Sequence, residues 1–234
     1  MKRERTILIA GSRQGLGRAL AEHYTCRGDT VFGLSRSESD LAHERYHHIC
    51  TDVTEEAKVQ QAFAQISATA RSLDSLIYSV GLKITAHALL TGPTQAADML
   101  RTNLLGAFLV TRHALRLMKR NGFGRVIYLS SIAVPLGSAG SVIYGASKAG
   151  LEQMAFSLSR EFSRDNITFN TVGISIYQSE MVEALGEKAL NETRAALVKP
   201  NNLELDEVVN AIDFFASDAA RQVTGQTIYF GGVR

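Results

Sequence analysis

The chain has 234 residues, of which 45% are hydrophobic and 21% are charged, which is ordinary for a soluble globular protein with one sizeable core. Its formal net charge is +2 and its charges are interspersed, so the sequence gives no reason to expect a nucleic-acid partner. The apolar run near the N-terminus ends at Gly11, too soon for an export signal, and no run is long enough to span a membrane, so we expect a cytoplasmic protein.

Short apolar or β-branched runs alternate with amphipathic stretches along the chain. The predicted strands are Thr6–Ala10, Thr30–Leu34, Tyr46–Cys50, Leu73–Tyr78, Arg125–Leu129, Thr168–Val172 and Thr227–Phe230. The predicted helices are Gly15–Arg27, Glu55–Arg71, Asp98–Lys119, Tyr144–Arg164 and Asp206–Ala216. Such alternation is typical of βαβ units, and wholly apolar strands indicate a sheet covered on both faces.

The sequence therefore predicts an α/β fold, a single-domain, Rossmann-type doubly wound parallel sheet of about seven strands flanked by helices. No repeat, linker or shift in composition marks a second domain within residues 1–234. The long interval without a strand, residues 175–203, has an amphipathic pattern and is predicted to be a substrate lid. A helix that simply packs on the core is the alternative.

A glycine-rich turn follows the first predicted strand and leads into the first helix. Its residues are Gly11, Ser12, Arg13, Gln14, Gly15, Leu16 and Gly17, with the spacing GxxxGxG. Glycines at such a turn let the backbone approach a pyrophosphate, whose charge then lies at a helix N-terminus. A turn without a ligand would also use glycines, but this position in an alternating chain favours a dinucleotide site.

The end of the second strand indicates which dinucleotide would bind. Ser35 and Arg36 stand there, and the first carboxylate is Glu38. A carboxylate at this place would bind the ribose hydroxyls of NAD, whereas Arg36, with Arg13 nearby, can hold a 2′-phosphate by charge-assisted hydrogen bonds. We therefore predict NADP(H), although both arginines would also be compatible with simple solvation.

Tyr144 and Lys148 form a YxxxK pattern at the start of a predicted helix, one turn apart on the same face. A neighbouring ammonium would lower the pKa of the phenol toward the working range, which makes Tyr144 a candidate proton donor. The preceding strand ends in Ser130 and Ser131, at the sheet edge where open α/β folds place their ligands.

The glycine turn, the strand that ends in Ser130-Ser131 and the YxxxK pattern resemble the motifs of the short-chain dehydrogenase/reductase family. They stand in the same order as in that family, and the resemblance extends along nearly the whole chain. Further matches are Asp52-Val53 after the third strand, Asn103 at the start of Asn103–Phe108, and Val223–Gln226 before the last strand. The resemblance implies an enzyme that transfers hydride between a nicotinamide cofactor and a carbonyl or alcohol.

The resemblance also implies roles for individual residues. Ser131 would stabilise the substrate oxygen, and Tyr144 would transfer the proton. Lys148 would hold the nicotinamide ribose and tune Tyr144, while Asn103 would anchor a water in a proton relay. Other residues would contact the cofactor: Asp52 and Val53 the adenine, Ser79 and Gly81 the adenosine ribose, and Ile176 and Ser179 the carboxamide.

Two motifs depart from the family pattern. The family's Asn-Asn-Ala-Gly after the fourth strand is replaced by Tyr78-Ser79-Val80-Gly81, so the amides that brace the sheet are missing. The family's Pro-Gly after the sixth strand is replaced by Ile174-Ser175. These changes concern nicotinamide positioning and leave the four catalytic candidates Asn103, Ser131, Tyr144 and Lys148 in place.

The branch most resembled reduces 3-oxoacyl groups on acyl carrier protein. An acidic carrier would need a basic rim, which Lys119, Arg120 and Arg164 could supply, although cations at helix C-termini are favourable without any partner. A small hydroxy-aldehyde, sugar or secondary-metabolite ketone is an equally compatible substrate.

Other hypotheses concern assembly and alternative functions. Residues such as Leu109, Phe156 and Leu158 are expected to be exposed on two long helices that, in the family, pair subunits into a homodimer or homotetramer. A catalytically weak NADP(H)-binding regulator remains a candidate because of the two altered motifs. An epimerase or dehydratase is disfavoured, because no acidic group is placed beside Tyr144.

Cysteine and histidine usage suggests neither disulfides nor a metal. Cys26 and Cys50 form no CxxC pair and are expected to be free thiols. His43, His47 and His48 cluster in the sequence, but a zinc site needs further ligands at defined spacing, so we predict no metal.

Overall fold

The computed structural model describes residues 4–178 and 186–233. Within them, a parallel sheet has the strand order β3-β2-β1-β4-β5-β6-β7. The strands are β1 Thr6–Ala10, β2 Thr30–Ser35, β3 Tyr46–Cys50, β4 Ser75–Tyr78, β5 Gly124–Ser131, β6 Ile167–Ile174 and β7 Thr227–Tyr229. The predicted fold class and parallel sheet are therefore confirmed.

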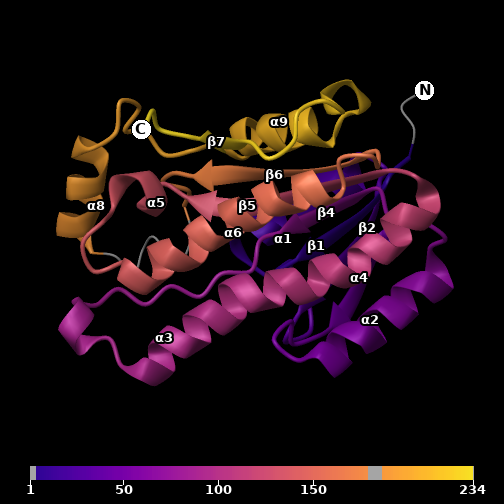
Figure 1. The fold of residues 1–234 in the computed structure, drawn as a ribbon, viewed down its shortest axis with the longest axis horizontal. Coiled ribbons are helices and arrows are strands. Elements are labelled where there is room, and N and C mark those ends of the chain that lie inside the picture. The colour runs from indigo at the N-terminus through magenta and orange to yellow at the C-terminus, as the bar shows by residue number, and fades with distance from the viewer. Residues whose placement is uncertain (1–3, 179–185, 234) are drawn as a thin grey trace.

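Helices connect the strands and cover the sheet (Figure 1). They are α1 Gly15–Cys26, α2 Glu56–Thr69, α3 Pro93–Leu100, α4 Gly106–Asn121, α5 Ala133–Leu136, α6 Val142–Glu161, α8 Glu187–Ala195 and α9 Leu205–Ala216. Short 3-10 turns lie at Ala88–Leu90 and Asp218–Ala220. None of the helices within the described ranges is long and apolar enough to cross a membrane.

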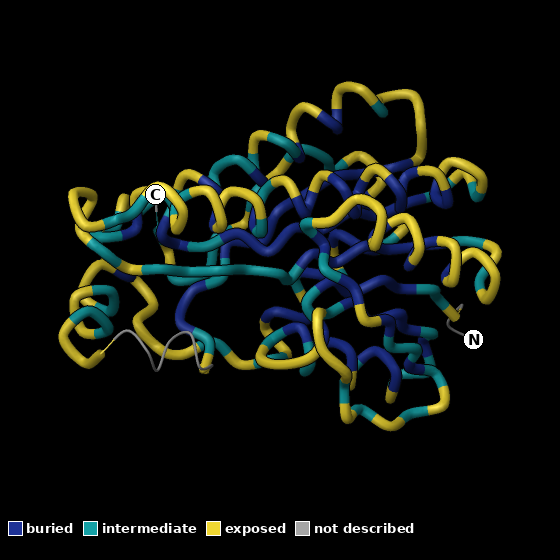
Figure 2. The backbone as a smooth tube through the Cα atoms, turned by 90° about the horizontal axis from the view of Figure 1, so that it is seen from below, coloured by how far each residue is buried: buried dark blue, intermediate teal, exposed yellow. Residues whose placement is uncertain are grey.

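Two apolar cores lie on opposite faces of the sheet. On one face, side chains of α2, α4 and α6 pack against alternate strand residues such as Leu8, Leu76 and Val126. On the other face, α1 and α9 pack against the intervening residues, such as Ile9 and Ile127. Figure 2 shows the buried strands running through the interior. Because both faces are covered, these strands are apolar throughout, which explains their continuous hydrophobic runs.

The predicted helix Asp98–Lys119 is in fact two α-helices joined by a π-helical segment at Arg101–Leu105. Its start is also earlier than predicted, at Pro93, where Gln95 accepts a hydrogen bond from the Gly92 backbone at 3.1 Å. Single π-helical turns inside α-helices are frequent at functional sites. Here the π-helical segment carries Asn103, one of the catalytic candidates.

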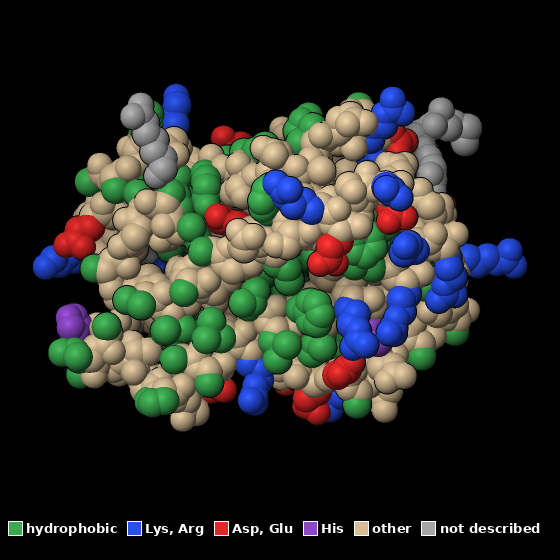
Figure 3. Space-filling model, viewed as in Figure 1, with side chains coloured by type: hydrophobic (Ala, Val, Ile, Leu, Met, Phe, Trp, Pro, Cys, Tyr) green, Lys and Arg blue, Asp and Glu red, His purple; other side chains and the backbone are tan. Residues whose placement is uncertain are grey.

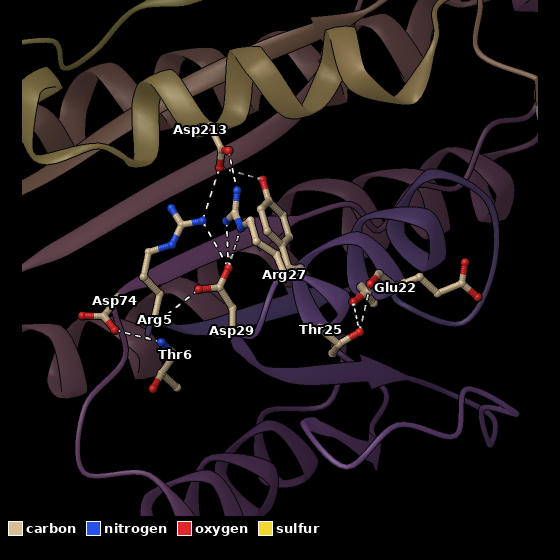
Figure 4. A network of polar contacts seen from close by, with 10 residues as sticks. Arg5, Thr6, Glu22, Thr25, Arg27, Asp29, Asp74 and Asp213 are labelled. Carbon is tan, nitrogen blue, oxygen red and sulfur yellow. Dashed lines mark hydrogen bonds and ion pairs between the residues drawn. The ribbon is translucent and has the colours of Figure 1, made fainter. Parts of the chain in front are cut away.

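A network of arginines and aspartates ties the start of β1 to α9 (Figure 4). Asp213 on α9 accepts hydrogen bonds from Arg5 at 3.3 Å and from Arg27 at 2.5 Å. Both arginines also contact Asp29, and the Tyr24 hydroxyl donates to Asp213 at 3.3 Å. The network therefore links β1, the α1–β2 turn and α9 at the edge of the sheet opposite the carboxyl ends of the strands.

The basic residues considered as a rim for a carrier protein lie at that same edge, where the parallel strands begin (the amino edge of the sheet). Lys119 and Arg120 end α4 just before β5, and Arg164 stands just before β6. Lys119 pairs there with Asp165 at 3.8 Å. These cations therefore lie at the edge of the sheet opposite the cavity, because helices that return to the next parallel strand end where that strand begins, and the alternative of favourable cations at helix C-termini fits this position.

Candidate active site

A cavity of about 730 Å³ opens at the carboxyl ends of the strands. It is lined by residues that follow or end β1, β2, β3, β4, β5 and β6, and by parts of the 175–203 interval. The strand register aligns the ends of β1, β2 and β4, since Ala10 pairs with Leu34 and Tyr78. It also aligns β5 with β6, since Ser131 pairs with Ile174, and these two strands extend three residues further, because Tyr78 pairs with Tyr128. Residues far apart in sequence therefore meet around one space, as expected for this sheet topology.

The glycine turn has the close backbone packing that a pyrophosphate site requires. A Cβ on Gly17 would lie 2.0 Å from the carbonyl oxygen of Gly11, and one on Gly11 would lie 2.9 Å from the Ser79 backbone. Gly11 and Gly15 also have positive φ angles of 89° and 56°. Larger side chains cannot occupy Gly11 and Gly17, so the turn lies tightly against β4 and at the start of α1.

Ser12 differs from its neighbours in the turn. It is fully buried and does not line the cavity, and its hydroxyl is 2.9 Å from the Tyr46 hydroxyl. Tyr46 in turn lies 3.1 Å from Nδ1 of His48, whose Nε2 lies 2.9 Å from the Ser37 carbonyl. The side chain of Ser12 therefore braces the turn against β3 and is not directed toward a phosphate.

Arg13, Ser35 and Arg36 line the cavity beyond the glycine turn, and Arg36 is exposed. Asp52 and Val53 line the same end. Burial raises the pKa of the Asp52 carboxyl, but two hydrogen bonds from Thr54, at 2.9 and 2.8 Å, and the charge of Arg36 outweigh it and hold that pKa below its ordinary value. Asp52 is therefore an ionised acceptor at neutral pH.

Ser79 and Gly81 line the cavity next to the glycine turn. Tyr78, which stands where the family has an amide, is fully buried, and its hydroxyl donates to the Thr102 carbonyl at 2.7 Å. A Cβ on Gly106 would lie 2.7 Å from that hydroxyl. The tyrosine therefore connects β4 to the π-helical segment, which replaces the missing amide brace.

Asn103 is fully buried and does not line the cavity. Its Oδ1 accepts from the Leu82 backbone at 2.7 Å, and its Nδ2 donates to the Leu82 carbonyl at 2.9 Å and to Ser147 Oγ at 2.9 Å. Ser147 then donates to the Tyr144 carbonyl at 2.7 Å. The side chain of Asn103 thus fixes the strand-four loop against the start of α6, and its predicted role in a water relay stays a prediction.

Ser131, Tyr144 and Lys148 meet at the wall of the cavity. Tyr144 lies in the first turn of α6 and is 5% exposed, and Ser131 forms a side-chain hydrogen bond with it. Lys148 is buried one turn later, where its Nζ donates to the Leu129 carbonyl at 2.8 Å and lies 5.9 Å from the centre of the Tyr144 ring. The strand end and the helix start therefore bring the three side chains together.

The pKa of the Tyr144 phenol is raised, which is opposite to the sequence prediction. Burial raises it, while the hydrogen bond with Ser131 lowers it in part. Burial also lowers the pKa of Lys148 to about 8. The prediction considered only the charge of the neighbouring ammonium. In the fold both groups are desolvated, and the ammonium donates to a backbone carbonyl.

The carboxyl end of β6 leads into the interval 175–203. Ile174, Ser175 and Ile176 line the cavity, and so do Leu190 and Thr193. Tyr177 forms a parallel β-bridge with Leu203, which closes the base of the interval. Ser179 lies outside the described residues. This segment therefore forms one wall of the cavity.

The sequence matches a family model described as enoyl-(acyl carrier protein) reductase over residues 10–232. The chain belongs to the short-chain dehydrogenase/reductase family. It is therefore an oxidoreductase.

Named relatives agree with this assignment. The 3-oxoacyl-[acyl-carrier-protein] reductase FabG of Escherichia coli is 29% identical over 231 residues, which cover 96% of this chain and 95% of FabG. The reductase MabA of Mycobacterium tuberculosis (strain ATCC 25618 / H37Rv) is 29% identical over 228 residues, covering 97% and 92%. The crystal structure of sorbitol-6-phosphate 2-dehydrogenase SrlD from Erwinia amylovora has a TM-score of 0.89 at 26% identity and covers 97% of this chain and 98% of its own.

Two groups in the site of this short-chain dehydrogenase/reductase were missed by the sequence interpretation. Glu152 on α6 accepts from Ser130 at 2.5 Å and from Tyr229 on β7 at 2.6 Å, so it braces the residue next to Ser131. Lys83 lines the cavity, with its Nζ 5.3 Å from the centre of the Tyr144 ring. Lys83 stands two residues after Gly81, but no sequence motif relates this position to Tyr144, so the sequence alone did not indicate their contact.

Among the residues that the structure describes, the ligand atoms of Glu38, His48 and Cys50 lie within 4.8 Å of one another. Both ring nitrogens of His48 are within hydrogen-bond distance of other groups, namely Tyr46 and Ser37. The prediction that this protein uses no metal stays a prediction.

The expected free thiols are confirmed, since Cys26 and Cys50 form no disulfide and are both exposed.

The lowered pKa of Lys148 predicts a pH dependence. Tyr144, with its raised pKa, keeps its proton well above neutral pH, whereas Lys148 loses its charge near pH 8. We expect the rate of carbonyl reduction to be constant below this pH and to fall above it. Initial rates of NADPH oxidation across pH 6 to about 10 measure this dependence.

The Lys83→Met variant is the control for this profile, because burial also lowers the pKa of Lys83. If Lys148 is the titrating group, the decline persists in the variant. A rate that stays constant to pH 10 in the wild-type enzyme would contradict the assignment.

Proposed function

We propose that this enzyme reduces a carbonyl group to a hydroxyl, with NADPH as hydride donor and Tyr144 as proton donor. The observation that supports it most is that the glycine turn and the group Ser131, Tyr144 and Lys148 line the same cavity. A dinucleotide that begins at the turn would end beside Tyr144. Concave sites of this size at strand carboxyl ends are the usual place for such ligands.

The residues present fit a phosphorylated dinucleotide. The turn at Gly11 and Gly17 excludes side chains where a pyrophosphate would approach, and α1 starts there with its free amides. Arg36 at the end of β2 would hold a 2′-phosphate, with Arg13 as a second cation. At the other end, Ser175 lines the cavity and its Oγ is buried without a hydrogen-bond partner within the described chain, which suits a carboxamide ligand.

When bound, the nicotinamide supplies the hydride; the chain's own residues orient the substrate and manage the proton. The Ser131 and Tyr144 hydroxyls would bind the substrate oxygen on which negative charge develops. Tyr144 would then release its proton from Oη to that oxygen. Lys148, whose charge is held close to the phenol, would stabilise the resulting phenolate and favour proton return.

The relatives support a 3-oxoacyl thioester on acyl carrier protein as one candidate substrate, because FabG and MabA carry that name. A small hydroxy-ketone or sugar is the second candidate, supported by the likeness to sorbitol-6-phosphate 2-dehydrogenase and by a cation, Lys83, inside the cavity. We also propose that residues 1–234 form one catalytic domain and that residues 175–203 act as its substrate lid. The contact of Ser179 with the carboxamide stays a prediction.

We further propose that the enzyme is a cytoplasmic homodimer or homotetramer. Figure 3 shows apolar side chains gathered on the face that α4 and α6 present. Leu105, Phe108 and Phe156 are 45%, 45% and 42% exposed. Leu109 and Leu158, which the sequence predicted to be exposed, are instead buried in the core of one subunit. The exposed set would be covered by a second copy.

Reduction of a carbonyl panel tests the proposed function. The panel contains 3-oxoacyl thioesters, small keto acids, phosphorylated ketones and neutral ketones, and NADPH oxidation is followed in each case. Turnover of at least one class supports the reductase. Tight NADPH binding without turnover of any class would favour the catalytically weak regulator.

A further inference from the structure

Lys83 lies in the catalytic cavity beside the proposed proton donor. Its Nζ is 5.3 Å from the centre of the Tyr144 ring, closer than the 5.9 Å of Lys148. The side chain is partly buried and lines the cavity with Ser131 and Ser138. A second ammonium group therefore lies on the side of the cavity where the carbonyl would be reduced.

The fold holds Lys83 in this place. Asn103 binds both backbone polar groups of the preceding residue, Leu82, at 2.7 and 2.9 Å. Leu82 and Ile84 on either side pack against the apolar cluster that contains Tyr144. The lysine is therefore carried by a backbone segment that is fixed to the catalytic helix and the π-helical segment.

No side chain within the described residues neutralises Lys83 by an ion pair or a hydrogen bond. Asp52 and Asp98 are the carboxylates among the described residues that line the cavity. Asp52 accepts hydrogen bonds from the backbone and the hydroxyl of Thr54. Burial alone lowers the pKa of Lys83, in line with an ammonium that has lost water and gained no counter-charge. The Tyr144 ring is a cation–π partner but carries no charge. A partly buried cation without a counter-charge is costly, so the counter-charge is expected to arrive with a ligand.

The cofactor is a poor candidate for the source of that counter-charge. The cations placed for its phosphates, Arg13 and Arg36, follow β1 and β2 at the adenosine end of the cavity, whereas Lys83 is at the Tyr144 end. The substrate is the remaining ligand at this end. Lys119 and Arg120 lie at the amino edge of the sheet, away from the cavity. Their position therefore does not support an acidic carrier protein as the source of the anionic group.

We propose that Lys83 binds an anionic group of the substrate close to the reacting carbonyl, so that the enzyme acts on small ketones or aldehydes bearing a carboxylate or a phosphate. This inference rests on the proposed reductase function and narrows its substrate class. The neutral 3-oxoacyl thioester then becomes the poorer substrate, because it offers Lys83 no charge near the carbonyl.

Matched substrate pairs test this proposal. Acetoacetate is compared with methyl acetoacetate, and dihydroxyacetone phosphate with dihydroxyacetone, so that each pair differs by one anionic group. We expect kcat/KM to be about 10- to 100-fold higher for the anion in one of the pairs, as for a charged hydrogen bond in a partly buried site. The pair that shows the preference identifies carboxylate or phosphate.

Variants assign that preference to Lys83. Lys83→Met should abolish it, so that the anion and its neutral partner are reduced with equal kcat/KM, and the KM for NADPH should stay within about two-fold, since Met keeps the apolar stem. Lys83→Arg should retain most of it, and Lys119→Met, at the opposite edge of the sheet, should not change it. Equal kcat/KM within both pairs, or a loss confined to NADPH binding in Lys83→Met, would overturn the proposal.

Binding measured without turnover separates this proposal from the proposed function. Calorimetry of acetoacetate and of dihydroxyacetone phosphate with the enzyme–NADP⁺ complex needs no reduction. Binding of one anion that Lys83→Met weakens supports the anion site even if no carbonyl is reduced. Reduction of neutral ketones together with equally weak binding of both anions in wild type and variant would leave the reductase standing and refute the anion site.

Discussion

Replacing Tyr144 by Phe is expected to reduce kcat for carbonyl reduction by about 10²- to 10⁴-fold, the range for loss of a positioned general acid. The Tyr144 hydroxyl is hydrogen-bonded to Ser131 at the cavity wall, and Ser131 also accepts from the Ala133 backbone at 3.1 Å. The ring itself packs with Met99 and Ala133, and Phe would keep that packing. The measurement is the steady-state rate of NADPH oxidation at saturating NADPH and a saturating concentration of the best carbonyl of the panel.

The control for Tyr144→Phe is cofactor binding. Because the change removes one oxygen and keeps the ring, the dissociation constant for NADPH should stay within about three-fold of the wild-type value. Tyr128→Phe is a matched variant, since that hydroxyl is buried against Thr111 outside the cavity, and it should retain activity. Full activity in Tyr144→Phe would remove this residue from the mechanism.

The second large effect is expected for Arg36→Asp. Arg36 lines the cavity at the end of β2 and is exposed, so its guanidinium is free to reach a 2′-phosphate. A carboxylate there would repel the phosphate and could accept from ribose hydroxyls instead. We expect kcat/KM with NADPH to fall by about 100-fold and that with NADH to change by less than about three-fold.

Arg71→Asp provides the same charge change outside the cavity, on the segment that follows α2. It should leave both cofactors unaffected. An equal loss with NADPH and NADH in Arg36→Asp would show that Arg36 serves the fold or a part of the dinucleotide common to both, and the NADP(H) assignment would be withdrawn.

The sequence was sufficient to predict the sheet and the edge at which the site lies. Strand runs such as Ile7–Ile9 and Val126–Leu129 are apolar throughout because both faces are covered, and that pattern is visible without coordinates. Once parallel strands are expected, the residues that follow them must meet at one edge. The glycine turn, Ser131 and Tyr144 were placed together in this way.

Side-chain direction and desolvation could not be predicted. Ser12 belongs to the glycine turn, yet its hydroxyl is directed to Tyr46, because only the fold brings β3 beside the turn. The pKa of Tyr144 is raised because its neighbours exclude water, a property of packing that a YxxxK spacing does not contain. Lys83 reaches Tyr144 through a tertiary contact held by Asn103, and a single sequence has no signal for such a contact.

Transfer of deuterium from NADPH labelled at the transferable C4 position is the most direct test of the central claim that this cavity reduces a carbonyl. The enzyme is incubated with labelled NADPH and the best carbonyl of the panel, and the alcohol is analysed by mass spectrometry. We expect one deuterium on the former carbonyl carbon with the wild-type protein, and at least about 100-fold slower labelling with Tyr144→Phe. NADPH that binds to the wild-type protein but yields no labelled alcohol from any carbonyl of the panel would contradict it.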